Sequence, residues 1–132
     1  MKQILLTILL ALSLCEPVKA NDTKIGLATY YSISTNGGST TSSGVPLSDN
    51  KLTAASVIFP LKSKLLITNL TNGKSITVTV TDTGPFATNS NGRALRPLRA
   101  HPSRIVDVSL AAAKALSFHG KGIAKVKVQK LK

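Results

Sequence analysis

The strongest constraint on the fold is a short alternating segment that ends in an acidic residue and a turn. Valine and threonine alternate from residue 77 to residue 81, which is the period-two pattern of a β-strand with one buried face. The valines point one way and the threonines the other. The segment stops at Asp82, and Gly84-Pro85 then predicts a turn. A carboxylate at the end of a rigid strand is well placed for chemistry or binding, so Asp82 is the first candidate site residue.

An Asn72-Gly73 pair precedes this strand and follows a second apolar run at 64–69. Asn-Gly between two such runs is the strongest short-range signal for a β-hairpin. We therefore expect antiparallel strands at 64–69 and 75–81.

The remaining segments predict a small all-β domain. Further strands are expected at 25–32, 52–56, 104–108 and 123–131. The 52–56 segment is short enough to be a single turn of helix instead. Five or six short strands favour a closed barrel, because closure leaves no exposed strand edges.

One short helix is expected after the 104–108 strand. Ser109 has the chemistry of an N-cap, and residues 110–116 are rich in alanine and leucine. The following segment alternates cleanly, which places Lys125 and Lys127 on a face turned to water.

The first 20 residues have the pattern of a secretory signal peptide. Lys2 gives a positive start, residues 4–14 are apolar, and Ala20 ends a small-residue cleavage site. The apolar run is shorter than the roughly 20 residues that a transmembrane helix needs. We therefore expect a signal peptide at 1–20 and one domain at 21–132, periplasmic or secreted. A retained membrane anchor is the alternative.

Cysteine and histidine usage argues against metal and thiol chemistry. Cys15 is the single cysteine and lies within the expected signal peptide. A lipid anchor at Cys15 is disfavoured because the bulky Leu14 precedes it. His101 and His119 alone do not make a structural zinc site. We therefore expect neither a structural zinc site nor thiol chemistry.

The net charge of +12 points to an anionic partner. Nucleic acid is disfavoured, since the chain is expected to be secreted and has few aromatic residues for base stacking. A cell wall or the surface of a membrane would attract the same charge. Alternatively, the excess of lysine only keeps a small secreted domain soluble.

Residues 83–103 form a long predicted loop, and loops of this length are usually functional or disordered. This loop and the residue after it carry Arg93, Arg96, Arg99, His101 and Arg104 with no acid among them after Asp82. Such a loop suits contact with an anionic or polar polymer. A solvated basic loop is the alternative.

Two adjacent tyrosines, Tyr30 and Tyr31, precede a polar loop at 34–46. Because neighbouring side chains of a strand point to opposite faces, one of them must point away from the core. An exposed tyrosine there could stack on a sugar ring or simply cover the rim of the domain.

Six segments, in this order, resemble the RlpA (rare lipoprotein A) family of double-psi β-barrel proteins. They are Gly26-Leu27-Ala28-Thr29-Tyr30-Tyr31, Thr41-Ser42-Ser43-Gly44, Leu52-Thr53-Ala54-Ala55, Leu66 to Ser75, Val80-Thr81-Asp82-Thr83-Gly84-Pro85-Phe86 and Arg104 to Ala113. The resemblance runs from about Gly26 to Val128. Expansins and some endoglucanases share the plan of this barrel.

The resemblance implies a six-stranded double-psi barrel with one short helix and a groove across one side. The family includes lytic transglycosylases that cleave peptidoglycan, with a preference for glycan strands without stem peptides. A general acid protonates the glycosidic oxygen and the 6-hydroxyl of the sugar closes a 1,6-anhydro ring, without water, metal or cofactor. Asp82 and Asp107 fall on acidic positions of the family motifs and are the implied catalytic residues.

The substrate-binding candidates come from the same segments and from the basic loop. They are Tyr30, Tyr31, Thr41, Ser43, Thr83, Arg93, Arg96, Arg99, His101 and Arg104. The expected partner is the glycan strand of peptidoglycan, bound by a monomer, with at most peripheral contact with a membrane and no nucleic acid.

The chain departs from the family pattern at three positions. Val45 stands where active members have Glu, Ser56 where they have His, and Thr83 where an Arg commonly follows the strand-end Asp. His101 could replace the missing histidine. Two alternatives to an enzyme therefore stay open: an expansin-like barrel that binds cell-wall glycan without cleaving it, and an inhibitor or effector that uses the barrel as a scaffold.

Overall fold

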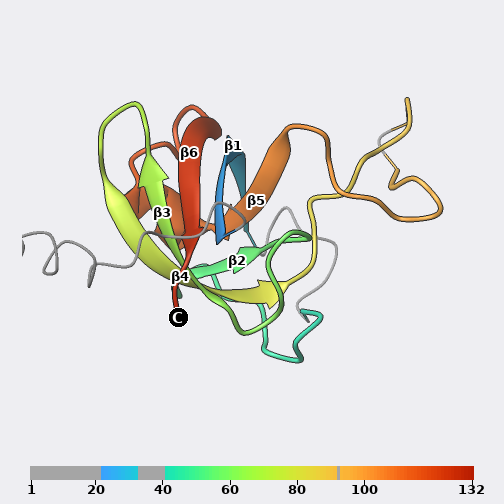
Figure 1. Cartoon of the computed structure of the whole chain (residues 1–132), viewed down its shortest axis with the longest axis horizontal. Helices are drawn as coiled ribbons and strands as arrows, with labels where there is room; N and C mark the ends of the chain where they lie inside the picture. The colour runs from blue at the N-terminus through green and yellow to red at the C-terminus, as the bar shows by residue number, and fades with distance from the viewer. Residues whose placement is uncertain (1–21, 33–40, 92) are drawn as a thin grey trace, which may run out of the picture.

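A computed structural model describes residues 22–32, 41–91 and 93–132 (Figure 1). The expected signal peptide and most of the 34–46 loop lie outside the described residues.

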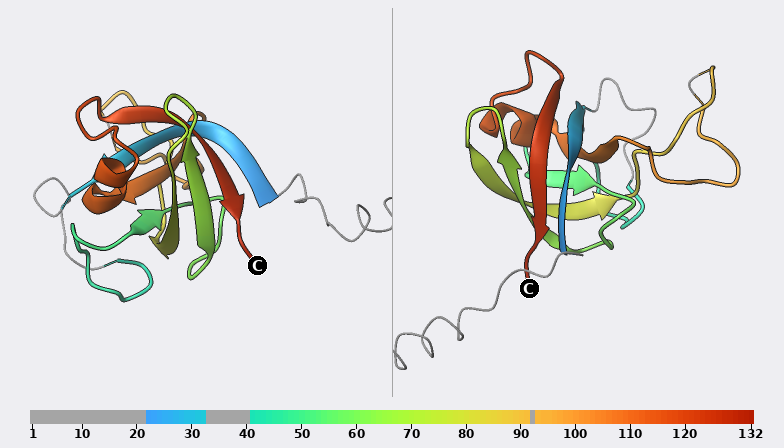
Figure 2. Two further views of the ribbon diagram at one scale, coloured as in Figure 1. Left: turned by 90° about the vertical axis from the view of Figure 1, so that its left-hand side faces the viewer. Right: turned by 45° about the horizontal axis from the view of Figure 1, so that its top comes forward.

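Six strands close into a barrel, which confirms the predicted all-β architecture. The strands are β1 (Thr23–Tyr31), β2 (Thr53–Ala55), β3 (Lys64–Asn69), β4 (Ser75–Asp82), β5 (Arg104–Ser109) and β6 (Ile123–Lys130). Around the barrel the order is β1-β5-β2-β4-β3-β6, and the last strand pairs with the first. The pairs β1–β5 and β2–β4 are parallel and the others antiparallel, so the chain crosses the barrel between partners (Figures 1 and 2).

The predicted hairpin is β3 and β4. They pair antiparallel, with Thr68 opposite Ser75 at the turn. Gly73 has a φ of +79°, a left-handed conformation that glycine adopts without steric cost. Its N–H donates to the carbonyl of Asn69 at 2.8 Å and closes the turn.

Alternating apolar residues of all six strands meet inside the barrel. The fully buried ones include Leu65, Ile67, Val78, Val80, Val106, Val108, Val126 and Val128. The predicted alternation of the last strand is confirmed, since Ala124, Val126 and Val128 are buried between exposed or half-buried neighbours.

The helix α2 (Leu110–Ala115) packs Ala112 and Ala113 against the barrel. As predicted, Ser109 is its N-cap, and the hydroxyl accepts a hydrogen bond from the N–H of Ala112 at 3.2 Å. No helix in the described part of the chain is long and apolar enough to cross a membrane.

Two irregularities of the strand register decide which side chains face outward. Leu27 and Ala28 of β1 pair with Arg104 and Val106 of β5, so Ile105 is an extra residue in β5. Arg104 and Asp107 are three apart, a spacing that would put them on opposite faces of a regular strand. The extra residue instead turns both to the outer face of the barrel.

The second irregularity lies at the end of β4. Ala54 pairs with Val80 and Ala55 with Asp82, so Thr81 is the extra residue. Asp82 therefore faces outward although it lies two residues after the buried Val80. Thr81 is buried, at 5% exposure, whereas the simple alternation predicted that it would share a face with the other threonines.

The long predicted loop is a folded-back arm, residues 83–103, which projects beside the barrel (Figure 1). Isolated bridges join Phe86 to Ala100 and Thr88 to Ala94. The N–H of Ala87 also donates to the carbonyl of Arg99 at 2.9 Å. The arm starts directly after Asp82 and returns to the barrel at Arg104.

The register of β5 makes a prediction about stability. A Cβ added at Gly26 would lie 2.7 Å from Cγ2 of Ile105 and 3.1 Å from the carbonyl oxygen of Ser103. We expect Gly26→Ala to lower the free energy of unfolding by about 1–3 kcal/mol, because the neighbours must shift. Urea denaturation measures this loss.

Gly120→Ala is the matched control, since nothing lies within 4 Å of its added Cβ. It should stay within about 0.5 kcal/mol of the wild type. The double variant Gly26→Ala/Ile105→Ala should lose less stability than the sum of the losses in the two single variants. Full additivity would contradict the proposed contact.

Candidate functional site

A cavity of about 320 Å³ opens on the outer face of the barrel where the arm begins. It is lined by Tyr31, Leu47, Ala55, Asp82, Thr83, Gly84, Pro85, Phe86, Thr88, Ala94, Arg104 and Asp107. The ends of β1, β2 and β4, the strand β5 and the arm therefore all contribute to one concave surface.

The two aspartates lie on either side of Ala55. In the strand register, Ala55 is the partner of Asp107 across one edge of β2 and of Asp82 across the other. Two strand spacings separate the aspartate backbones, which is about 10 Å. The methyl side chain of Ala55 leaves the space between the carboxylates open, so both can reach one bound group.

Asp82 is held by three hydrogen bonds to one oxygen. Its Oδ1 accepts from the N–H of Ser42 at 3.0 Å, from the hydroxyl of Ser42 at 2.7 Å and from the N–H of Thr83 at 2.8 Å. Among the described residues, Oδ2 has no hydrogen-bond donor. The carboxylate is thus fixed in orientation with one oxygen available to a ligand.

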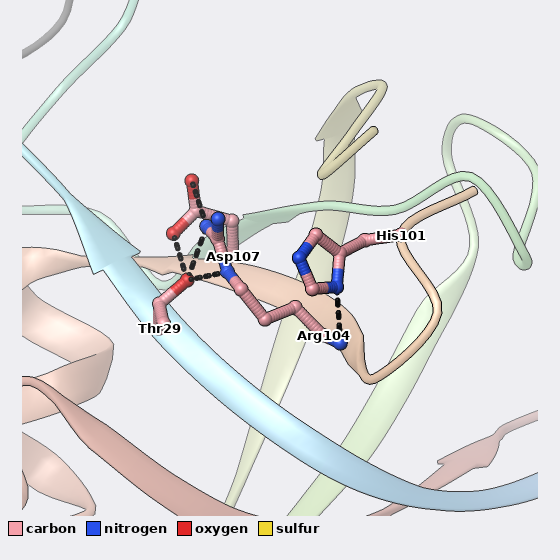
Figure 3. Close-up of polar contacts among 4 residues, drawn as sticks. All are labelled: Thr29, His101, Arg104 and Asp107. Carbon is pink, nitrogen blue, oxygen red and sulfur yellow. Dashed lines mark hydrogen bonds and ion pairs between the residues drawn. The ribbon is translucent and has the colours of Figure 1, made fainter. Parts of the chain in front are cut away.

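Asp107 is linked to Arg104 through Thr29 (Figure 3). The Thr29 hydroxyl donates to Oδ1 of Asp107 at 3.1 Å and accepts from Nε and Nη2 of Arg104 at 3.0 and 2.6 Å. The direct ion pair between Nη2 of Arg104 and Oδ2 of Asp107 is longer, at 3.9 Å. Thr29 therefore sets the distance between the two charges.

The pKa of the Asp107 carboxyl is raised above its ordinary value, chiefly because burial penalises the charged form. Arg104 and the Thr29 hydroxyl oppose this rise, and the negative charge of Asp82 adds to it. Burial likewise raises the pKa of Tyr31, whose hydroxyl lies 2.7 Å from the hydroxyl of Thr53. Tyr31 therefore stays a neutral hydrogen-bonding group at the cavity.

His101 is used at the junction of the arm and β5. Its Nδ1 accepts hydrogen bonds from the backbone N–H of Ser103 at 3.1 Å and from that of Arg104 at 2.9 Å. Figure 3 shows the bond to Arg104. The backbone N–H of His101 donates to the carbonyl of Pro85 at 3.2 Å. His101 thus holds the two ends of the arm together and positions Arg104, but it does not line the cavity.

The structure brings five of the sequence-predicted site residues together around the cavity. They are Tyr31, Asp82, Thr83, Arg104 and Asp107. Thr41 and Ser43 lie just behind, in the turn that presents Ser42 to Asp82: their hydroxyls are 3.0 Å apart, and the N–H of Ser43 donates to the carbonyl of Thr81 at 3.1 Å.

Four of the predicted residues lie elsewhere. Tyr30 faces the barrel interior and contacts Phe118 edge to face, with ring centroids 6.2 Å apart. Arg93, Arg96 and Arg99 are exposed on the arm and do not line the cavity.

Sequence reasoning did not select Thr29, Ser42 or Ala55 as functional residues. Thr29 could have been found from strand alternation, since it shares a face with Tyr31. Ser42 and Ala55 carry no local signal, because their importance comes from contacts with residues about 27 to 52 positions away.

Of the three departures from the family pattern, Thr83 lines the cavity, whereas Ser56 and Val45 do not. Ser56 is buried, and its hydroxyl accepts from the N–H groups of Ile58 and Phe59, both at 3.1 Å. Val45 is exposed and its N–H donates to the hydroxyl of Ser43 at 3.3 Å. In the described residues, no three His, Cys, Asp or Glu side chains gather as a metal site would require.

A family model described as lytic transglycolase matches residues 23–128. The chain belongs to the lytic transglycolase family. The match covers five strands in full, all but the last two residues of β6, and both aspartates, so the resemblance seen in the sequence motifs is confirmed.

Curated relatives of this lytic transglycolase domain are named endolytic peptidoglycan transglycosylase RlpA. The protein of Rickettsia bellii is 39% identical over 71% of the chain and 35% of its own length. That of Neisseria meningitidis serogroup A is 38% identical over 85% of the chain and 41% of its own length. The chain thus spans about two fifths of the length of the curated relatives it matches.

Solved structures agree on the fold. The Streptomyces papain inhibitor superposes with a TM-score of 0.60 at 18% identity, over 88% of the chain and 100% of that protein. The Clavibacter michiganensis expansin superposes with a TM-score of 0.55 at 20% identity, over 83% of the chain and 50% of that protein. At such low identity, these likenesses describe the double-psi barrel alone.

The charges around Asp107 predict two opposite changes of its pKa. Arg104→Gln removes the cation that favours the carboxylate, so the pKa of Asp107 should rise further. Asp82→Asn removes a like charge, so the pKa should fall, and by less, because Asp82 contributes least. Carboxyl carbon chemical shifts in an NMR titration measure both.

Lys114→Gln is the control, because it removes a cation from α2, away from the cavity lining. It should leave the titration of Asp107 unchanged. Shifts of the same sign in Arg104→Gln and Asp82→Asn would show that the two groups do not act on Asp107 as the geometry requires.

Proposed function

We propose that the domain is a peptidoglycan lytic transglycosylase that cleaves within glycan strands, preferring strands without stem peptides, and leaves 1,6-anhydro ends. The observation that carries the proposal is the pair of carboxylates, Asp82 and Asp107, on either side of Ala55 in an open cavity. Membership of the lytic transglycolase family and the names of the curated relatives supply the substrate class.

The reaction needs one proton donated and one proton removed, with no water consumed. The glycosidic bond breaks as its oxygen takes a proton, and the 6-hydroxyl of the same sugar attacks C1 and loses its proton. Asp82 is the residue proposed to move these protons, through its uncommitted Oδ2. Asp107 adjusts the electrostatics of the site and orients the sugar.

The remaining cavity residues bind rather than react. Tyr31 and Thr83 line the cavity and offer a ring face and a hydroxyl to the sugar. Thr41 and Ser43 support the turn that holds Asp82, and Arg104 is held toward the cavity by Thr29 and His101. The arginines of the arm contact the glycan strand farther from the cavity. Tyr30 supports Tyr31 from the interior of the barrel.

The same proposal covers place and partners. A glycan-strand substrate fits action in the periplasm or outside the cell, after removal of the expected signal peptide near Ala20. The domain acts as a monomer. It uses no metal or cofactor, because proton transfer by carboxylates is sufficient for the reaction.

Asp82→Asn tests the reaction. Amidase-treated sacculi, which carry few stem peptides, are incubated with the protein and the released fragments are analysed by mass spectrometry. Wild type should release anhydro-ended fragments, and Asp82→Asn should be slower by a factor of about 10² or more, the usual contribution of a positioned acid or base. Asp22→Asn, a carboxylate outside the cavity, should match wild type.

A second candidate, a barrel that binds cell-wall glycan without cleaving it, is favoured by one observation. Val45 and Ser56 stand where active members of the family have Glu and His, and the hydroxyl of Ser56 is already hydrogen-bonded to backbone N–H groups. It predicts sedimentation with sacculi that weakens at high salt, and no anhydro ends even from wild type. Equal rates for Asp82→Asn and wild type would instead remove Asp82 from the reaction.

A further inference from the structure

A second cavity, of about 200 Å³, lies on the other side of β1. Its lining residues are Leu27, Asn69, Thr71, Asn72, Ser117, Phe118, Lys121, Ile123, Ala124 and Lys125. They come from β1, the β3–β4 turn, the end of α2 and the start of β6. None is acidic and two are lysines.

The positive charge of this cavity is not neutralised within the described residues. Neither the Lys121 nor the Lys125 ammonium group forms a hydrogen bond or an ion pair with another described residue. The amides of Asn69 and Asn72 both donate to the carbonyl of Leu116, at 2.9 and 3.0 Å, and fix the wall of the cavity. Two free cations over a rigid polar wall suit an anion.

The strand register connects this cavity to the first one. Thr29 is the partner of Asp107 on one side and of Ile123 on the other. Since Ala55 likewise joins Asp107 to Asp82, one row of residues crosses five adjacent strands. Figure 2 shows β1 and β6 side by side, as the register requires.

The members of this row on β5, β1 and β6 present their side chains outward. Thr29 of β1 contacts Asp107 of β5, and Ile123 of β6 is 44% exposed and lines the second cavity. Adjacent strands lie about 4.8 Å apart, so Ile123 is about 10 Å from Asp107 along the row. A polymer lying along the row from the first cavity therefore reaches the second without leaving the surface.

We propose that the second cavity is a binding subsite for the same glycan strand, in which Lys121 and Lys125 bind a carboxylate carried by the sugar chain. The inference rests on the proposed function for its substrate class. Leu27 and Ile123 offer apolar surface to a sugar ring as the chain crosses β1. A free carboxylate on the strand matches the two lysines, whereas a strand whose carboxylates are blocked loses that interaction.

The test compares a lysine pair inside the cavity with a pair outside it. Lys121→Gln/Lys125→Gln removes the cations of the subsite. Lys114→Gln/Lys130→Gln removes the same charge from exposed positions that do not line the cavity. Fluorescence anisotropy measures binding of end-labelled, peptide-free glycan strands, with Asp82→Asn in every protein so that the strands stay intact.

The expected result depends on the length of the ligand and on its carboxylates. The subsite pair should bind an octasaccharide about five- to tenfold more weakly than the parent at low salt, and the difference should shrink at high salt. A disaccharide, which cannot fill both cavities at once, should bind the parent much more weakly than the octasaccharide does. Strands whose carboxyls are reduced to alcohols should bind the parent and the subsite pair equally.

Three outcomes would overturn the proposal: an equal loss in the control pair, an undiminished affinity of the subsite pair for the octasaccharide, or no binding of the octasaccharide by the parent. Anhydro-product release by the otherwise wild-type protein is measured in parallel. Release without the lysine effect keeps the proposed reaction and refutes the subsite. The lysine effect without release keeps the subsite and refutes the reaction.

Discussion

The site depends on the register of the closed barrel. Closure pairs every strand on both edges, so a residue inserted into a ladder cannot be absorbed by a free edge and must turn its neighbours. Ile105 and Thr81 are two such residues. Each turns an aspartate outward, and β2 between them fixes the separation of the carboxylates. The cavity thus exists because two strands carry one residue more than their partners. A buried valine next to each extra residue, Val106 beside Ile105 and Val80 beside Thr81, anchors it to the core.

Asp107 shows how this framework controls a charge. Burial raises its pKa, and Arg104 opposes this rise. The Arg104 side chain is 33% exposed and its Nη2 lies 3.9 Å from Oδ2 of Asp107, while Thr29 makes the closer contacts with both groups. Water screens the ion pair, so burial remains the larger effect. The hydroxyl of one threonine therefore keeps the carboxyl responsive to a second charge across the cavity, that of Asp82.

Features that depend on neighbours in sequence could be predicted, and those that depend on register could not. The hairpin at Asn72-Gly73, the N-cap at Ser109 and the alternation of β6 follow from local chemistry. Asp82 was found because it ends an alternating strand and precedes a turn, and Asp107 because its segment resembles a family motif. Ala55 was missed because only the pairing of β2 with two other strands gives a methyl group its role. The fold of the arm holds only Arg104 against the cavity. No local sequence pattern distinguishes Arg104 from the other three arginines, Arg93, Arg96 and Arg99, which carry the same charge.

The row of outward residues from Asp82 to Ile123 carries different charges at its two ends. Its two carboxylates lie at β4 and β5, and beyond Ile123 the surface carries Lys121 and Lys125 with no described acid lining that cavity. A neutral sugar chain would gain little from this arrangement, whereas a chain with regularly spaced carboxylates would be repelled by the two aspartates and attracted by the lysines. The carboxylate pair can then act on a glycosidic bond only if the acidic substituents are held away from it. Lysines about two strands farther along the row are placed to do this, so binding at the second cavity and proton transfer at the first would be parts of one alignment of the strand.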